Sequence, residues 1–340
     1  MTEQPLRFGV LGLGNWGDRL ATTVAALPGA EIASCFARSP QRRQSYAERH
    51  NCRAAGSLED FLSGPIDAVL IATPHTTHVE LVVAAAVAGK HVMVEKPLAL
   101  TVAGARECIA AADAAGVILQ VAHYRRRLPA TRRLREVIDK GLIGQILHAS
   151  GWFSRAWGVD LVRPWRDDPA ECPLGGMTSF GIHMVDNLHY LVGRVESLTC
   201  LTRRLTDVND LDDVTVAMLA FESGAVGTVG TSVRTPLVAS TAVFGTVGSA
   251  WSEEDGTRFF YQARDDEVRR EQPVEKVDGV LANLEAFTHS IRTSTPPETG
   301  GAEALEVVAV LEAMIESAEA GGAVIEVEEV RRQGDLGNVI

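Results

Sequence analysis

Hydrophobic and polar positions follow two different patterns along the chain, and the pattern changes near residue 123. In the first part, short apolar runs alternate with longer amphipathic or charged segments, which predicts strands that alternate with helices. We expect strands at residues 6–11, 31–36, 67–72, 91–95 and 117–121, and helices at residues 15–26, 39–49, 77–88 and 102–115. The pattern predicts an α/β domain, with a doubly wound parallel sheet of the Rossmann type, over residues 1–123.

Beyond residue 123, strand-like runs follow one another with glycine turns between them, which predicts a mostly antiparallel sheet. The expected strands are 146–154, 195–204, 213–222, 224–234 and 240–244, a turn at 246–249, and short last strands at 251–252 and 259–261. Helices are expected at 129–140, 279–292 and 302–321. We therefore predict an α+β domain, with a large open sheet carrying helices, over residues 124–340.

Length and charge agree with two folded domains that do not bind nucleic acid. The 340 residues exceed what one hydrophobic core normally holds. The net charge of -12 disfavours a phosphate backbone as partner. Arginine runs at 125–127 and 132–133 are local exceptions, and we interpret them as solvated side chains at a helix start.

The cysteines and the chain start favour a reducing compartment. Five scattered cysteines without a CxxC spacing indicate neither a disulfide framework nor a zinc site, so no metal is assigned. Residues 1–5 carry no secretion pattern, and the longest apolar stretch, 79–88, is too short for a membrane span. We expect a cytoplasmic protein without a membrane partner.

A glycine fingerprint, Gly12-x-Gly14-x-x-Gly17, follows the first strand and opens the first helix. In that context Gly12 permits a tight turn, Gly14 lets backbone amides approach a pyrophosphate, and Gly17 allows helix and strand to pack closely. Asn15 and Trp16 lie at the helix N-terminus, which favours negative charge. The motif predicts a dinucleotide cofactor.

The end of the second strand favours NADP over NAD. An acidic residue usually holds the ribose 2'-hydroxyl of NAD at this place, but the chain has Arg38 and Ser39 instead. Both can bind a 2'-phosphate. Stacking of Arg38 on adenine, without selectivity for the phosphate, is the alternative.

Two further motifs supply groups for proton transfer. Glu95-Lys96-Pro97 ends a parallel strand, at the sheet edge where ligands bind. Lys96 taken alone would be interpreted as a surface lysine. In the segment 175–186, Ser179, His183 and Asp186 are spaced i, i+4 and i+7, and therefore share one face of a helix. A buried core histidine is the alternative for His183 taken alone.

With these motifs the chain resembles the Gfo/Idh/MocA family of oxidoreductases over essentially its whole length. The resemblance rests on the glycine fingerprint, the Glu95-Lys96-Pro97 motif, His183 with Asp186, and the segments 72–78, 89–92 and 141–144. It implies a Rossmann domain, a C-terminal domain with an open sheet for substrate binding and oligomerisation, a nicotinamide cofactor, and homodimers or homotetramers formed through that sheet.

The resemblance also implies roles for particular residues. Lys96 and His183 would be catalytic, with His183 as the acid/base and Lys96 as the donor to the reacting oxygen. Ser179 stands where the family usually has an aspartate, and a hydroxyl cannot replace a carboxylate as a proton carrier. Substrate contacts are expected from Asp186, Ser179, Tyr124, Arg125 and Arg166, and cofactor contacts from Gly12, Gly14, Asn15, Trp16, Gly17, Arg38, Ser39, Thr73, Pro74, His75, His78, Glu95, Lys96, Pro97 and Arg166.

The expected function is hydride transfer between NADP or NAD and a hydroxyl or keto group of a small polyhydroxylated substrate: a sugar, cyclitol, dihydrodiol or related polyol. Two alternatives stay open. One is glycoside cleavage through transient oxidation by bound nicotinamide, and the other is a sensor that binds the dinucleotide without catalysis.

Overall fold

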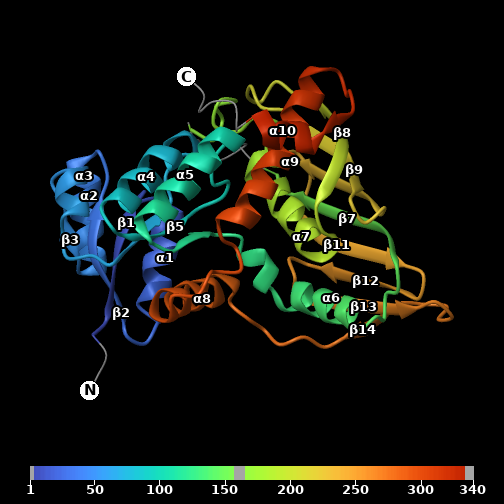
Figure 1. Ribbon diagram of the computed structural model, residues 1–340, viewed down its shortest axis with the longest axis horizontal. Helices are drawn as coiled ribbons and strands as arrows, with labels where there is room; N and C mark the ends of the chain where they lie inside the picture. Colours follow the sequence, from blue (N-terminus) through green and yellow to red (C-terminus); the bar gives the residue numbers. More distant parts are fainter. Residues whose placement is uncertain (1–3, 157–164, 334–340) are drawn as a thin grey trace. The chain divides into compact units, whose positions relative to one another are not determined.

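The computed structural model describes residues 4–156 and 165–333, and these form two compact units. The first unit comprises Met1–His123 together with Gly279–Leu305, and the second comprises Tyr124–Asp278 together with Glu306–Ile340. Figure 1 follows the chain from the blue parallel sheet of the first unit to the green, yellow and orange strands of the second. No helix in the described segments is long and apolar enough to cross a bilayer.

The first unit is a six-stranded parallel sheet with helices, as the alternating pattern predicts. Its strand order is β3-β2-β1-β4-β5-β6. The strands are β1 (Leu6–Leu11), β2 (Ala30–Phe36), β3 (Arg53–Ala54), β4 (Ala68–Ile71), β5 (His91–Val94) and β6 (Leu119–Val121). The helices are α1 (Asn15–Val24), α2 (Pro40–His50), α3 (Leu58–Leu62), α4 (His78–Val87) and α5 (Val102–Ala115). The short elements β3 and α3 are not among those expected from the sequence.

The centre of this sheet is buried on both faces. All four residues of β4 are inaccessible to solvent, because β4 lies between β1 and β5 and helices cover the sheet. A strand in that position needs apolar side chains in both directions, which explains its unbroken apolar sequence. The predicted Rossmann fold is confirmed.

Helix α8 (Gly279–Thr293) belongs to the first unit, whereas the predicted boundaries place it in the second. Phe287 is buried, with its ring centroid 6.2 Å from that of Phe8 in β1. The Gln120 side chain donates to the carbonyl of Asn283 at 3.0 Å, and the Thr299 hydroxyl donates to the carbonyl of Val121 at 2.7 Å. The chain therefore returns to the first sheet after completing most of the second unit, and in Figure 1 α8 lies beside α1.

The second unit contains a nine-stranded sheet of order β14-β13-β12-β11-β7-β10-β9-β8-β15. Only the β7–β10 pair is parallel among the described pairings, so the predicted mostly antiparallel sheet is confirmed. The strands are β7 (Ile146–Ser154), β8 (Val195–Arg203), β9 (Val214–Phe221), β10 (Val226–Ser232), β11 (Val238–Gly245), β12 (Gly248–Glu253), β13 (Arg258–Ala263), β14 (Arg270–Gln272) and β15 (Ile325–Glu326).

Some strand boundaries differ from those expected. The turn expected at 246–249 is wrong in its second half, because β12 begins at Gly248 and pairs with both β11 and β13. Strands β14 and β15 are not among the expected elements. The helices of this unit are α6 (Pro129–Asp139), α7 (Ile182–Val192), α9 (Gly301–Glu319, which starts in the first unit) and α10 (Val327–Gln333).

Side chains alternate between the two faces of the large sheet. In β9, Ala217 and Leu219 are buried, while Met218 between them is 60% exposed. Helix α7 packs on the buried face at β7, where a Cβ on Gly151 would come within 2.7 Å of the Met184 Cβ. The close approach of helix to strand at Gly151 fixes the position of the helix that carries His183 and Asp186.

Candidate active site

The glycine turn after β1 has the geometry that its sequence predicts. Gly12 has a φ of +90°, and a Cβ there would overlap the backbone carbonyl of Ala72. A Cβ on Gly17 would overlap the carbonyl oxygen of Gly12, so helix and turn can pack this closely only with glycine. A Cβ on Gly14, in contrast, would meet no atom within 4 Å. The turn is closed on the protein side and open at Gly14, which suits the approach of a ligand.

Helix α1 begins at Asn15 directly after this open glycine. Gly14 is its N-cap and supplies no side-chain hydrogen bond to the first turn. Asn15 is exposed and Trp16 is half-buried. The first amides of a helix and the positive end of its dipole favour an anion, so the residues present fit the pyrophosphate of a dinucleotide.

The loop after β2 presents Arg38 to solvent. Arg43 orders this loop by donating to the carbonyls of Ala37 at 3.1 Å and Gly56 at 3.2 Å, and its guanidinium lies 5.3 Å from the Phe36 ring. The Ser39 hydroxyl accepts from the amide of Arg42 at 3.4 Å and so caps α2. Ser39, expected to contact the cofactor, thus also caps the N-terminus of α2, while Arg38 is exposed on an ordered loop.

The loops after β4 and β5 are joined through His78. Its Nδ1 lies 2.7 Å from the carbonyl oxygen of Pro97, and its Nε2 lies 3.1 Å from that of Thr73. The Thr77 hydroxyl lies 2.8 Å from that of Thr73 and donates to the carbonyl of Pro74 at 2.7 Å. The His78 ring is fully buried, so it connects two loops from within and does not present an edge to solvent.

The neighbouring site residues lie on the same two loops. His75 is buried, and its ring meets the His78 ring edge-on at 5.7 Å. Glu95 is buried, and its amide donates to the carbonyl of Ile71 at 2.8 Å. Lys96 follows it, half-buried, with a cis peptide bond to Pro97. Lys96 therefore lies where the sequence predicts, just beyond the carboxyl end of β5.

In the second unit, Ser179 lies in a π-helical turn, Met177–Gly181, that leads into α7. The i, i+4, i+7 spacing expected for Ser179, His183 and Asp186 assumes a uniform α-helix, and this assumption is wrong for Ser179 because a π turn closes i→i+5 hydrogen bonds. The Ser179 hydroxyl lies 3.4 Å from the Cys172 sulfur. Such turns are frequent at functional sites.

Aromatic rings surround His183. The imidazole is 5% exposed. Its ring centroid lies 5.7 Å from that of Tyr124, in an edge-on arrangement, and 6.1 Å from that of Phe153. Phe153 in turn lies 4.9 Å from Phe180. Phe153 and Phe180 are not among the site residues expected from the sequence. An aromatic residue in a strand or an apolar helix is interpreted as part of the hydrophobic core.

Asp186 forms a buried ion pair with Arg126. The Arg126 Nε lies 2.9 Å from both carboxylate oxygens, and Nη2 lies 2.7 Å from Oδ1. Both side chains are at most 4% exposed. Burial and the nearby Arg126 charge lower the pKa of His189, on the next turn of α7. The Asp186 carboxylate, expected to contact substrate, is thus engaged by an arginine.

The arginines at 125–127 are not the solvated run that the charge pattern indicates. Arg125 and Arg126 are each 3% exposed, in a 3-10 helix over Tyr124–Arg127, so that expectation is wrong for both. Arg125 pairs with Asp255, and its guanidinium lies 4.0 Å from the Phe153 ring. The interpretation failed because both partner carboxylates lie far away in sequence, 60 and 130 residues on.

Arg166, the last of the expected site residues, is half-buried, and its guanidinium lies 4.4 Å from the Trp165 ring. The chain directly before Trp165 lies outside the described residues.

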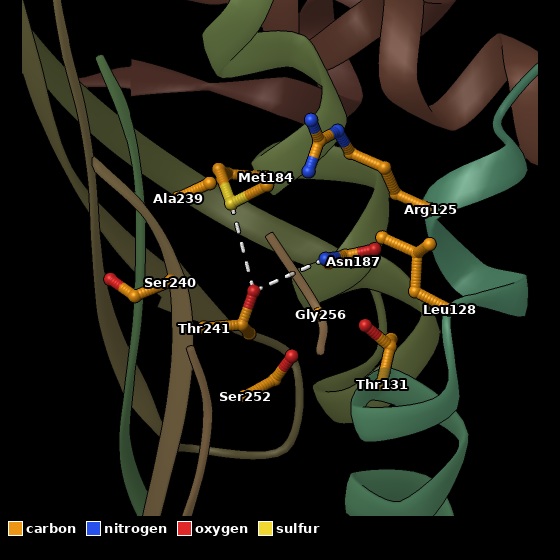
Figure 2. A pocket seen from close by; sticks show the side chains of 10 residues that line it. All are labelled: Arg125, Leu128, Thr131, Met184, Asn187, Ala239, Ser240, Thr241, Ser252 and Gly256. Carbon is orange, nitrogen blue, oxygen red and sulfur yellow. Dashed lines mark hydrogen bonds between the residues drawn. The ribbon is translucent and has the colours of Figure 1, made fainter. Parts of the chain in front are cut away.

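A small cavity of the second unit lies beside α7, where Met184 and Asn187 line it (Figure 2). Asn187 and Thr241 point toward each other across it, and Asn187 donates to the Thr241 hydroxyl at 3.1 Å. About 180 Å³ of empty space, part of it open to solvent, lies among these side chains. Arg125 lines it from one element, and Thr241 and Ser252 line it from the sheet.

Asp186→Ala should lower the free energy of unfolding by about 3–5 kcal/mol, because it leaves the Arg126 guanidinium buried without its partner. Urea titration monitored by circular dichroism measures the loss. The double variant Asp186→Leu/Arg126→Met should recover most of it, since no buried charge is left. An equal loss in the single and the double variant would show that packing, and not the ion pair, is what Asp186 contributes.

Comparison with known proteins identifies the family. Residues 6–123 match the family model described as "Oxidoreductase family, NAD-binding Rossmann fold", and residues 131–251 match the GFO/IDH/MocA C-terminal domain. The chain is 31% identical over 251 residues to trans-1,2-dihydrobenzene-1,2-diol dehydrogenase of Mus musculus, across 72% of this chain and 74% of that protein.

Two further similarities extend over more of the chain. It is 26% identical over 325 residues to 1,5-anhydro-D-fructose reductase of Ensifer adhaerens, across 93% of this chain and 97% of that one. Levoglucosan dehydrogenase, solved with NADH and levoglucosan, shares the fold with a TM-score of 0.88 at 24% identity, across 95% of this chain and 100% of that one. The resemblance found in the sequence is confirmed, and the chain belongs to the GFO/IDH/MocA family of oxidoreductases.

Proposed function

We propose that this oxidoreductase transfers hydride between NADP, or NAD, and a hydroxyl or keto group of a small cyclic polyol or sugar. One observation carries the proposal: the open glycine turn after β1 and Lys96 after β5 lie at the same edge of one parallel sheet. Only β4 separates the two strands, so these features are about 10 Å apart at strand spacing. An anion site and an amine at that distance suit the pyrophosphate and the reacting end of one dinucleotide.

The chemistry divides between the cofactor and the side chains. When bound, the nicotinamide cofactor supplies the hydride acceptor or donor. Lys96 donates a hydrogen bond to the substrate oxygen and stabilises the negative charge that develops there during oxidation. His183 takes the hydroxyl proton in oxidation and returns it to the oxygen in reduction. Asp186 acts through Arg126, by fixing the helix that carries His183.

The surroundings of His183 favour a cyclic substrate with one apolar face. Tyr124 and Phe153 flank the imidazole, and the carboxylates of Asp186 and Asp255 are paired with arginines within the protein. An open-chain polyol needs a hydrogen-bond partner for each hydroxyl, whereas a ring can lay its C–H face on an aromatic side chain. The names of the relatives agree: a dihydrodiol for the mouse protein and an anhydro sugar for the bacterial one. We therefore propose cyclic vicinal diols and anhydro or keto sugars as substrates.

Lys96→Met and His183→Ala should each lower turnover by about 10²–10⁴-fold, the usual contribution of an acid/base or charge-stabilising group. Binding of the cofactor, measured by calorimetry, should change little. Rates are measured from nicotinamide absorbance against cyclic diols and keto sugars. Lys140→Met and His289→Ala, at exposed positions, are the matched controls. Unchanged turnover in either test variant would refute its assigned role.

We propose that NADP is preferred to NAD, because Arg38 is exposed on an ordered loop at the end of β2. Arg38→Ala should weaken NADP binding by about 10–100-fold, as expected for loss of a charge-assisted hydrogen bond to a phosphate. NAD binding should stay the same. Calorimetry with both coenzymes measures this, with Arg42→Ala on the neighbouring helix as control. Equal weakening for NADP and NAD would indicate stacking on adenine instead of phosphate recognition.

We propose further that copies of the chain associate through the exposed face of the large sheet. That face carries Trp152, Leu201, Met218 and Val226, which are 36–60% exposed, and neighbouring strands place them on one surface. A contiguous apolar surface of this kind favours association. The cytoplasmic location expected from the cysteines remains a prediction.

Met218→Glu should convert the dimer or tetramer into monomers, because it buries a charge in the proposed interface. Sedimentation velocity measures the change. Val268→Glu, equally exposed but outside the sheet, should leave the assembly intact. A wild-type protein that sediments as a monomer, or an assembly that tolerates Met218→Glu, would contradict the proposal.

A further inference from the structure

The turn between β12 and β13 holds three consecutive residues in the left-handed region. Their φ values are +47° for Glu254, +59° for Asp255 and +79° for Gly256. Only the glycine adopts this conformation without steric cost, although aspartate tolerates it better than most residues. Two non-glycine residues in succession are uncommon, and such backbone outliers persist where the surrounding structure enforces them.

Neighbouring elements of the second unit hold this turn in place. The Asp255 amide donates to the carbonyl of Ala239 at 3.2 Å, and the Ala130 amide donates to the carbonyl of Gly256 at 3.1 Å. A Cβ on Gly256 would lie 2.7 Å from the Leu128 side chain, so the turn packs tightly against the segment that leads into α6. The result is a fixed backbone position for Asp255, whose side chain is 47% exposed.

That side chain meets Arg125. The Asp255 carboxylate accepts from Nη1 of Arg125, whose side chain is 4% exposed. The Arg125 guanidinium lies 4.0 Å from the ring centroid of Phe153 and 5.6 Å from that of Tyr124. Its planar cation therefore contacts both aromatic side chains, and Asp255 determines where that cation lies.

Phe153 and Tyr124 are the two rings that flank His183. The contacts thus run in a continuous series from the strained turn to the imidazole: carboxylate, guanidinium, aromatic rings, histidine. Every member belongs to the second unit. No member other than His183 has a titrating or nucleophilic role in the proposed reaction.

We propose that Asp255 is a positioning residue for His183, which acts by holding Arg125 against Phe153 and Tyr124. The proposal rests on the proposed function for its effect on catalysis, but its structural part stands independently. With the ion pair intact, the two rings keep the imidazole in one orientation toward the substrate hydroxyl. Without it, Arg125 and the rings gain freedom, and small displacements of an acid/base group lower turnover strongly.

Asp255→Asn is the informative variant, because asparagine has the shape of aspartate and also tolerates the left-handed conformation. It removes the charge and keeps the turn. Glu254→Gln is the matched control: it alters the preceding left-handed residue, which pairs with the half-buried Arg258. Asp255→Gly also removes the carboxylate, and glycine adopts the left-handed conformation without steric cost. The same effect in this variant therefore cannot come from a misfolded turn.

The direct readout is the NMR signal of the His183 ring protons, which the ring currents of Tyr124 and Phe153 displace. In Asp255→Asn and Asp255→Gly this signal should move toward the position of an exposed histidine, and kcat should fall about 10-fold with less change in KM. Glu254→Gln should leave both unchanged. Melting temperatures verify that the variants fold.

A wild-type His183 signal with wild-type kcat in Asp255→Asn would overturn the proposal. A displaced signal in a protein that shows no turnover even as wild type would instead support the positioning role and contradict the proposed function. Failure of the positioning role and failure of the proposed function therefore give different results.

Discussion

The register of three parallel strands is the constraint on which the first unit depends. Leu11 of β1 pairs with Ile71 of β4, and Ile71 pairs with Val94 of β5, so the three strands end at the same level. The residues that follow are the glycine turn, the Ala72 to His78 loop and the Glu95-Lys96-Pro97 motif. Because parallel strands bring their carboxyl ends to one edge, motifs more than eighty residues apart in sequence become neighbours. His78 then joins two of these loops through their backbone carbonyls.

In the second unit, the comparable constraint comes from ion pairs made by two buried arginines. Arg126 pairs with Asp186 and Arg125 pairs with Asp255, and each pair links the 3-10 helix after residue 123 to a different element. The Arg126–Asp186 pair is buried on both sides, whereas Asp255 is 47% exposed. A buried ion pair contributes little net stability, because desolvation offsets much of its attraction, but loss of one partner is costly. Their consequence here is orientation: they restrict the helix and the aromatic rings around His183 to one arrangement.

The sequence predicts those features of the structure that depend on residues close together in the chain. The glycine turn, five of the six strands of the parallel sheet and the position of Lys96 depend on neighbours within a few residues, and the structure has them where expected. Helix α8 could not be assigned to the first unit, because its apolar face is equally suited to either sheet until Phe8 is known to lie beside Phe287. The π turn at Ser179 and the burial of Arg125 and Arg126 depend on distant partners, which neither periodicity nor charge pattern reveals.

The most direct test of the account follows the hydride itself. Purified protein is incubated with NADPH or NADH deuterated at C4 of the nicotinamide, together with cyclic ketones and keto sugars, and the products are analysed by mass spectrometry. Direct hydride transfer should give an alcohol that carries one deuterium on the newly formed carbinol carbon, from one face of the nicotinamide only. Products without deuterium from either coenzyme, in a protein that calorimetry shows to bind that coenzyme, would contradict it.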